Sequence, residues 1–177
     1  ARSVVDVIES MDAYDIYGFV DEAEKGSSVY RGYKMIGHDD NLQEIYDLGI
    51  RYAFVCVGYL GQGRVRDGLY RRLKQIGFEL PVLIDPTAVL ARDARVGEGT
   101  FIGKKVVINS KAAVGKMAII NTSAVVEHDC KIGDYCHISV NSTLCGEVHI
   151  EDRSFVGAGA TVIQKIRVGK DCVIGAG

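Results

Sequence analysis

The chain has 177 residues, enough for one large domain or two small ones. With 47% hydrophobic and 25% charged residues it has the composition of an ordinary globular protein, and its net charge of -2 provides no general basic surface for nucleic acid. No apolar run approaches the ~20 residues that span a bilayer, and no signal peptide is visible.

The first 80 residues alternate between helical and strand patterns. In chain order, we expect a helix over 2–11, a strand over 14–20, a short hairpin over 29–36, a helix from 39 or 40 to 48, a strand over 51–57, a helix over 64–76 and a strand over 78–84. Asp39 or Asp40 is expected to cap its helix, and Gly49 and Gly77 are expected to end theirs. Alternating strands and helices typically form a parallel sheet, so residues 1–80 predict a Rossmann-like nucleotide-binding domain.

This domain opens inside its first helix, without the strand that should precede it. In domains of this type, a glycine-rich phosphate loop joins the first strand to the first helix. We therefore expect that loop to lie before Ala1, and we interpret the chain as part of a longer protein. The repeat described below also stops in the middle of a unit, at Gly177.

Asp21-Glu22 follows the strand expected over 14–20. A carboxylate at this point, roughly 20 residues after the phosphate loop, commonly holds a ribose hydroxyl. Turn chemistry before Lys25-Gly26 explains Asp21 equally well, so both interpretations stay open.

Two further features of this domain are interpreted as structural. His38 directly precedes the expected helix cap. The helix over 64–76 carries a basic face that could attract phosphates, but we interpret it as a solvated face; it consists of Arg64, Arg66, Arg71 and Arg72.

A repeat of six residues fills the second half of the chain. Every sixth residue is aliphatic: Ile84, Leu90, Val96, Ile102, Ile108, Val114, Ile120, Val126, Ile132, Ile138, Leu144, Ile150, Val156, Val162, Val168 and Ile174. The residue four positions later is nearly always small, with Val106, Val148 and Ile166 as the larger members. A period of six fits neither a helix nor a simple alternating strand, but it is typical of a parallel β-helix. Three repeats form one coil, so residues 81–177 predict about five coils stacked ~4.8 Å apart.

Two histidines of the coil lie outside the inward register. His128 comes two residues after an inward valine, so its side chain should point out of the coil, and His137 is expected at a corner. A flanking carboxylate, from Glu127 or Asp129, can orient the His128 imidazole and raise its basicity. Such a histidine suits general-base catalysis. A solvated surface histidine fits the same spacing, so both interpretations stay open here.

The five cysteines lack paired spacing, and no CxxC motif occurs. We therefore expect free thiols and neither a disulfide framework nor a zinc site. Cys130, Cys136 and Cys172 occupy the small-residue register, where a thiol serves as a compact core residue. Together these features indicate a reducing, cytoplasmic compartment.

The two-domain layout, the stretch from Asn121 to Cys130 (Asn-Thr-Ser-Ala-Val-Val-Glu-His-Asp-Cys) and the stretch His137-Ile-Ser-Val140 resemble one family. It is the hexapeptide-repeat sugar acetyltransferase family, which includes UDP-4-amino-sugar N-acetyltransferases of bacillosamine synthesis and sialic-acid O-acetyltransferases. The resemblance covers the whole chain and implies a left-handed coil.

The resemblance also implies site residues at matching positions. His128 matches the catalytic base, and Asp129 matches the carboxylate that raises its basicity. His137, Ala158 and Ala176 match contacts to acetyl-CoA, although corner geometry alone also explains the Gly-Ala-Gly stretches around the two alanines. Asp21, Glu22 and Gly58 match contacts to the UDP-sugar.

The implied function is acetyl transfer from acetyl-CoA to the amino group of a UDP-linked amino sugar, in surface-glycan biosynthesis. A backbone amide near Gly146, one coil after His128, is expected to meet the oxyanion. O-acetylation of a sialic acid is the near alternative. A non-catalytic scaffold that binds nucleotide-sugars is more distant, because a scaffold has no need of an outward histidine flanked by carboxylates.

The resemblance further implies a homotrimer with active sites between subunits. The same coil occurs in γ-type carbonic anhydrases, whose metal ligands include two histidines five residues apart. The coil histidines here lie at 128, 137 and 149, so no such pair exists and we expect no metal.

Overall fold

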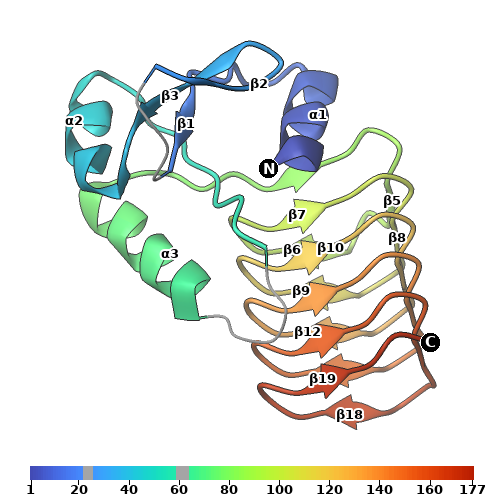
Figure 1. The fold of residues 1–177 in the computed structure, drawn as a ribbon. Helices are drawn as coiled ribbons and strands as arrows, with labels where there is room; N and C mark the ends of the chain where they lie inside the picture. The colour runs from blue at the N-terminus through green and yellow to red at the C-terminus, as the bar shows by residue number, and fades with distance from the viewer. Residues whose placement is uncertain (22–25, 59–63) are drawn as a thin grey trace.

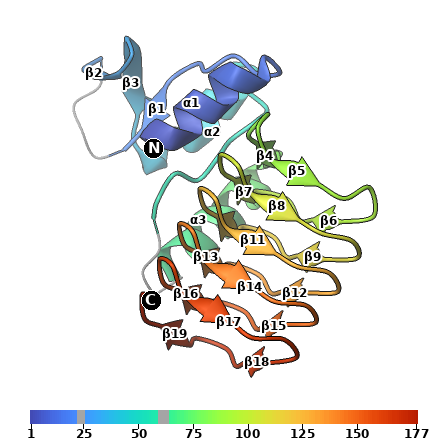
Figure 2. The ribbon, with the colours of Figure 1, turned by 90° about the vertical axis from the view of Figure 1, so that its right-hand side faces the viewer.

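The structure is a computed structural model that describes residues 1–21, 26–58 and 64–177. It has two parts, a stack of coils and a small α/β domain packed beside the first coils of the stack (Figures 1 and 2). Within the described residues, no helix is long and apolar enough to cross a membrane.

The coil is built from short parallel strands in three sheets, which form the three faces of a prism. The first face holds β4 (Leu83–Ile84), β7 (Phe101–Ile102), β10 (Ile119–Ile120), β13 (His137–Ile138), β16 (Phe155–Val156) and β19 (Val173–Ile174). The second face holds β5 (Val89–Leu90), β8 (Val107–Ile108), β11 (Val125–Val126), β14 (Thr143–Leu144) and β17 (Thr161–Val162). The third face holds β6 (Arg95–Val96), β9 (Ala113–Val114), β12 (Lys131–Ile132), β15 (His149–Ile150) and β18 (Arg167–Val168).

The six-residue period explains this architecture. Each strand ends on one of the predicted aliphatic residues, and those of the middle coils, such as Ile102 and Ile120, are fully buried. Ile120 lies opposite Ile102 and Ile138 in the neighbouring strands, so residues 18 apart stack on one another. Small residues such as Ala118 fill the space beside the turns. The predicted parallel β-helix is therefore confirmed.

A turn joins each face to the next, and most turns place a non-glycine residue in the left-handed region. We name the three columns of turns by the faces that they join: the first–second, second–third and third–first edges. Asp129, with φ of 58°, belongs to the second–third edge, and Met117, with φ of 55°, belongs to the third–first edge.

The N-terminal domain contains three α-helices, α1 (Arg2–Met11), α2 (Leu42–Asp47) and α3 (Arg64–Ile76), among its described residues. Its sheet has the order β1-β3-β2, with β1 (Phe19–Val20) parallel and β2 (Ser28–Tyr30) antiparallel to β3 (Tyr33–Gly37). The helices predicted over 2–11 and 64–76 and the hairpin around Gly32 are confirmed.

Several predicted elements of this domain were wrong in extent. The strand expected over 14–20 is limited to β1, and the strand expected over 51–57 is reduced to one parallel bridge between Tyr52 and Glu79. The strand expected over 78–84 consists of that bridge and of β4. The expected cap at Asp39 or Asp40 is also wrong, because a 3₁₀ turn over Asp39–Asn41 begins at His38 and precedes α2.

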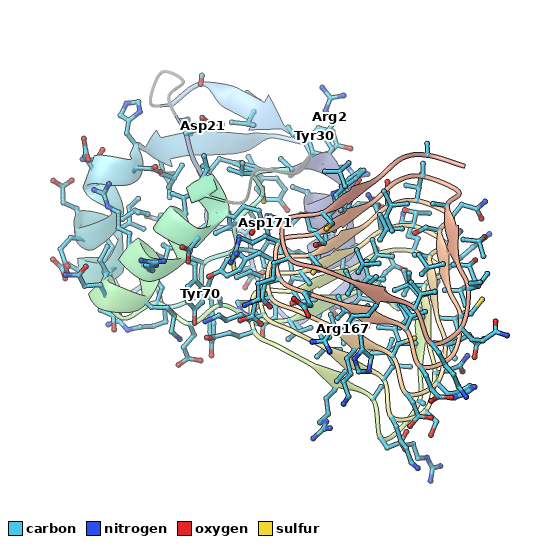
Figure 3. The ribbon with its side chains drawn as sticks, turned by 90° about the horizontal axis from the view of Figure 1, so that it is seen from below. Arg2, Asp21, Tyr30, Tyr70, Arg167 and Asp171 are labelled. Atoms are coloured by element: carbon cyan, nitrogen blue, oxygen red, sulfur yellow. The ribbon has the colours of Figure 1, made fainter. Side chains whose placement is uncertain are left out.

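Helix α3 docks on the third–first edge of the coil through polar contacts. The hydroxyl of Tyr135 donates to Asp67 at 3.0 Å, and the hydroxyl of Tyr70, labelled in Figure 3, donates to Glu98 at 2.6 Å. The hydrogen bond to the Glu98 carboxylate raises the pKa of Tyr70 to about 12, so this hydroxyl keeps its proton near neutral pH.

Helix α1 lies against the first face. Val7 packs with Leu83 and Phe101, and Lys104 of the coil forms an ion pair with Asp6. The N-terminal domain therefore holds the coil through two helices, α1 on the first face and α3 on the third–first edge.

Candidate active site

The outward histidine predicted at position 128 lies in the turn between β11 and β12, on the second–third edge. Its side chain is 57% exposed, which confirms that it points out of the coil. The ring Nδ1 lies 3.0 Å from Oδ2 of Asp129. Because a carboxylate only accepts hydrogen bonds, this contact assigns the ring proton to Nδ1 and leaves the lone pair on Nε2. The unprotonated Nε2 is the atom that a general base uses.

The backbone holds the catalytic pair in place on both sides. The N–H of Asp129 donates to the carbonyl of Ser110 in the coil before, and the carbonyl of His128 accepts from the N–H of Glu147 in the coil after. Both contacts repeat along the second–third edge because the coil returns every 18 residues. The pair therefore stands on a rigid ladder, which suits a catalytic group that must keep its orientation.

Gly146 forms the surface against which the His128 ring lies. A Cβ atom added at Gly146 would lie 2.6 Å from Nε2 and 2.7 Å from Cε1 of the imidazole, closer than real Cβ contacts. The N–H of Gly146 makes no hydrogen bond within residues 1–21, 26–58 and 64–177. This N–H and Nε2 therefore border the same small surface, where a donor and a base would serve one reacting group.

His137 differs from its prediction. It was expected at a corner and outside the buried positions, but it is the first residue of β13 and only 9% exposed. Its Nε2 lies 3.3 Å from the side-chain nitrogen of Asn121, and its ring meets Phe155 edge-on with 5.1 Å between centroids. The N-terminal domain lies over the first face at this height, which explains the burial.

A cavity of about 150 Å³ separates His137 from the N-terminal domain. Asn121 and His137 line it from the coil, Cys56 and Gly58 from the segment before α3, and Ser3 and Val4 from the start of α1. From the sequence, Asn121 was only the first residue of a motif and had no role of its own. Its 16-residue spacing from His137, which brings the two side chains together on adjacent strands, is the pattern that could have identified it.

Ala158 and Ala176 lie one coil apart on the first–second edge, joined by a hydrogen bond from the N–H of Gly177 to the carbonyl of Ala158. Both alanines are exposed. A Cβ atom at Gly157 would lie 2.6 Å from the Ala176 nitrogen, so the two turns pack closely. The structure thus forms a bare strip here, but it does not bring that strip together with His128, which lies on another edge.

The predicted acceptor residues lie in the N-terminal domain. Asp21 directly follows β1 and is exposed; its carbonyl accepts a hydrogen bond from Nδ1 of His38 at 2.7 Å. This contact supports the structural interpretation of His38. Glu22 lies outside the described residues. A Cβ atom added at Gly58 would meet no heavy atom within 4 Å, so Gly58 lies on an open rim.

The basic face expected on α3 is also wrong at one position. Arg66 is only 3% exposed, whereas Arg71 forms an exposed ion pair with Asp67, and Arg72 one with Asp40. Nothing in the local sequence distinguishes Arg66, because its burial comes from the coil residue Met117 far along the chain.

All five cysteines are free thiols. Cys130 and Cys136 are buried as predicted, and burial raises the pKa of Cys136 to about 12, but Cys172 is partly exposed. Over the described part of the chain, no group of three or more His, Cys, Asp or Glu side chains could hold a metal ion.

Two family models match the chain. The model of the PglD N-terminal domain matches residues 1–73, and the model of the hexapeptide repeat of succinyl-transferase matches residues 147–177. The structure is also similar to PerB from Caulobacter crescentus, solved in complex with CoA and GDP-perosamine. The identity is 34% and the TM-score 0.91, over 99% of this chain and 81% of that chain.

A second similar structure is the acetyltransferase domain of PglB from Neisseria gonorrhoeae, which was also solved with acetyl coenzyme A. The identity is 30% and the TM-score 0.89, over 99% of this chain and 83% of that chain. WeeI from Acinetobacter baumannii is 23% identical over 99% of this chain and 84% of its own, with a TM-score of 0.81, which shows the shared fold. The paired N-terminal domain and left-handed parallel β-helix, matched over nearly the whole chain at 34% identity, show that this protein is an enzyme of the hexapeptide-repeat sugar acetyltransferase family.

Proposed function

We propose that this protein transfers the acetyl group of acetyl-CoA to the amino group of a nucleotide-linked amino sugar, with His128 as the general base. The observation that carries the proposal is the pair formed by His128 and Asp129, with Nδ1 bound to the carboxylate and Nε2 beside the Gly146 backbone. PerB, solved with CoA and GDP-perosamine, supports the substrate class. A variant of that perosamine N-acetyltransferase with asparagine in place of a histidine was solved with the same two ligands.

The chemistry requires no covalent enzyme intermediate. The amine nitrogen attacks the thioester carbonyl while Nε2 of His128 removes a proton from it. The N–H of Gly146 donates a hydrogen bond to the oxyanion that forms on the carbonyl oxygen. The carbon–sulfur bond then breaks, the acetyl group stays on the nitrogen, and the CoA thiolate takes up the proton. Asp129 keeps the imidazole in the reactive tautomer throughout.

The remaining predicted residues would bind the two substrates. We assign acetyl-CoA to the bare strip at Ala158 and Ala176, together with His137, and the nucleotide-sugar to Asp21, Glu22 and Gly58. The pantetheine arm can lie close to the coil at the strip because no long side chain stands there. We expect UDP as the nucleotide, although the GDP-sugar bound to PerB makes GDP the first alternative to test.

An assay of thiol release tests the proposal directly. Acetyl-CoA is incubated with the enzyme and a UDP-linked or GDP-linked 4-amino sugar, and free CoA is measured with a thiol reagent. Release should depend on the acceptor, and mass spectrometry should find a product heavier by one acetyl group and stable to mild alkali. The matching N-acetylated sugar nucleotide serves as the control acceptor and should give no release.

Other outcomes of the assay decide between the alternatives. An alkali-labile acetyl ester on a sialic acid, formed faster than any amide, would replace N-acetylation with O-acetylation. Binding of nucleotide-sugars without acetyl transfer to any amino sugar or sialic acid would leave a binding scaffold. We place the reaction in the cytoplasm, as a step in surface-glycan biosynthesis; five free thiols suit that reducing compartment.

We further propose that the active enzyme is a homotrimer. The N-terminal domain, with Gly58, covers the first face and the third–first edge, whereas His128 lies on the second–third edge, opposite the first face. One chain therefore cannot bring its own acceptor-binding residues to its own base. The outward residues of the second face are uncharged and suit contact with another copy: Val89, Val107, Val125, Thr143 and Thr161.

Light scattering should therefore give a mass of three chains for the active species. Acetyl transfer by a protein that remains a monomer at assay concentration would contradict the prediction. The oligomeric state is best measured in the presence and absence of CoA, since a ligand bound between subunits stabilises the assembly.

A further inference from the structure

Arg66 has an unusual environment for a charged side chain. It belongs to α3 and is 3% exposed, and it is the one lysine or arginine among the buried residues of the described chain. Within the same residues, no carboxylate lies within ion-pair distance of its guanidinium. Burial accordingly lowers the pKa of Arg66. A buried cation without an anion is costly, so its hydrogen bonds need an explanation.

The guanidinium binds three backbone carbonyls. Its Nη1 donates to Val55 at 3.1 Å and to Val57 at 2.6 Å, and its Nη2 donates to Met117 at 2.9 Å. Two of these carbonyls belong to the segment before α3, and the third belongs to a turn of the coil. The buried Nε has no partner within the described residues.

These bonds replace the ladder that the segment lacks. Residues 53–58 are held to the sheet side only through the bridge at Tyr52, where the N–H of Ala53 donates to Glu79. Beyond that point, the carbonyls of Val55 and Val57 bind Arg66 instead of a neighbouring strand. The same contact explains why the strand expected over 51–57 does not form. Arg66 therefore sets where this segment stands relative to the coil.

The segment forms one wall of the cavity above His137. Cys56, Val57 and Gly58 line the cavity from above, and Asn121 and His137 line it from the coil. Because Arg66 binds the upper wall and the coil through one rigid planar group, it fixes the width of the opening between them.

We propose that Arg66 is a positioning residue for the nucleotide-sugar, which it serves by holding the Gly58 segment at a fixed distance from the coil. This rests on the proposed function in one respect, that Gly58 contacts the acceptor. Stability alone does not account for Arg66, because apolar residues of similar volume usually replace buried charges without loss of folding. A guanidinium that touches only carbonyls contributes geometry to the opening.

The test compares three variants of the full chain. Arg66→Met removes all three hydrogen bonds and keeps the length of the side chain, and Arg66→Lys keeps a cation without the planar fork. Arg72→Met is the matched control, because Arg72 lies on the same helix and pairs only with the exposed Asp40. Arg66→Met should raise the Michaelis constant for the nucleotide-sugar by roughly tenfold or more, with Arg66→Lys between it and wild type. Turnover at saturation and the Michaelis constant for acetyl-CoA should stay within about threefold of wild type, as both should for Arg72→Met.

Hydrogen exchange supplies a measurement that needs no substrate. Peptides covering 53–58 should exchange faster in Arg66→Met than in wild type, while peptides from the middle coils keep their protection. Equal exchange over 53–58 in the two proteins would overturn the proposal. So would a parallel rise in both Michaelis constants together with a lower melting temperature, which is the result of a merely structural role. If Arg66→Met fails to fold, Arg66→Lys carries the same comparison.

Calorimetric titration with UDP and GDP separates this proposal from the function itself. If the wild-type enzyme acetylates no nucleotide-sugar, the proposed function fails, and the positioning role still stands or falls on exchange over 53–58. If the wild type is active and Arg66→Met binds the nucleotide and turns over the sugar as well as wild type does, the positioning role alone is wrong.

Discussion

Replacing His128 by alanine should lower turnover by roughly 10²–10⁴-fold, the usual contribution of a general base. The imidazole serves the acceptor amine, so the Michaelis constant for acetyl-CoA should change little. Melting temperature should also change little, because the side chain is 57% exposed and stands outside the core. Steady-state kinetics with a confirmed amino-sugar nucleotide measure both constants, and near-wild-type turnover would end the proposed mechanism.

His149→Ala is the matched control for this variant. His149 is the first residue of β15, on the third face, so it belongs to the same coil region but has no carboxylate in the adjoining position. Its replacement should leave turnover unchanged. Asp129→Asn is a useful companion, since asparagine also tolerates the left-handed backbone at that turn. It should give a milder loss than His128→Ala, because the base remains but its tautomer is no longer fixed.

Gly146→Ala should lower turnover by roughly 100-fold, the effect of displacing a catalytic group by about 1 Å. The added methyl group would come 2.6 Å from Nε2 of His128, so the ring must rotate away from the surface where the amine is attacked. The imidazole is the far end of an exposed side chain and can yield, so the protein should fold normally. The expected result is therefore an inactive enzyme with a normal melting temperature.

Gly169→Ala provides the control for that substitution. A Cβ atom at Gly169 would meet only the sulfur of Cys172, at 3.7 Å, which is ordinary van der Waals contact. Turnover in Gly169→Ala should match wild type. If Gly146→Ala also matches wild type, then the ring does not need the glycine surface, and the Gly146 N–H loses its place in the mechanism.

The features that sequence alone predicted correctly depend on local geometry or on strict repetition. The coil follows from the six-residue period, because every repeat must place its aliphatic residue inside. The pair of His128 and Asp129 follows equally directly, since both are adjacent at a turn whose direction the period fixes. The same period placed Gly146 one coil away from His128, before any contact was visible.

The features that sequence missed depend on contacts between the two domains. His137 occupies an outward position of the coil, and only the N-terminal domain lying over it makes it buried. Arg66 appears on its helix beside exposed arginines, and its burial depends on Met117, 51 residues away. The strand expected over 51–57 failed for the same reason, because Arg66 takes its carbonyls. No periodicity encodes a contact of this kind.

The 18-residue return of the coil also restricts how the length of this chain can change. Removing or adding 18 residues leaves every later residue on its original face and shortens or lengthens the stack by one storey. Removing six residues instead rotates all that follows by one face, which would carry Gly146 from the edge of His128 to a different one. Length variation among proteins built this way should therefore occur in whole storeys, or as excursions at the turns that return to the same register.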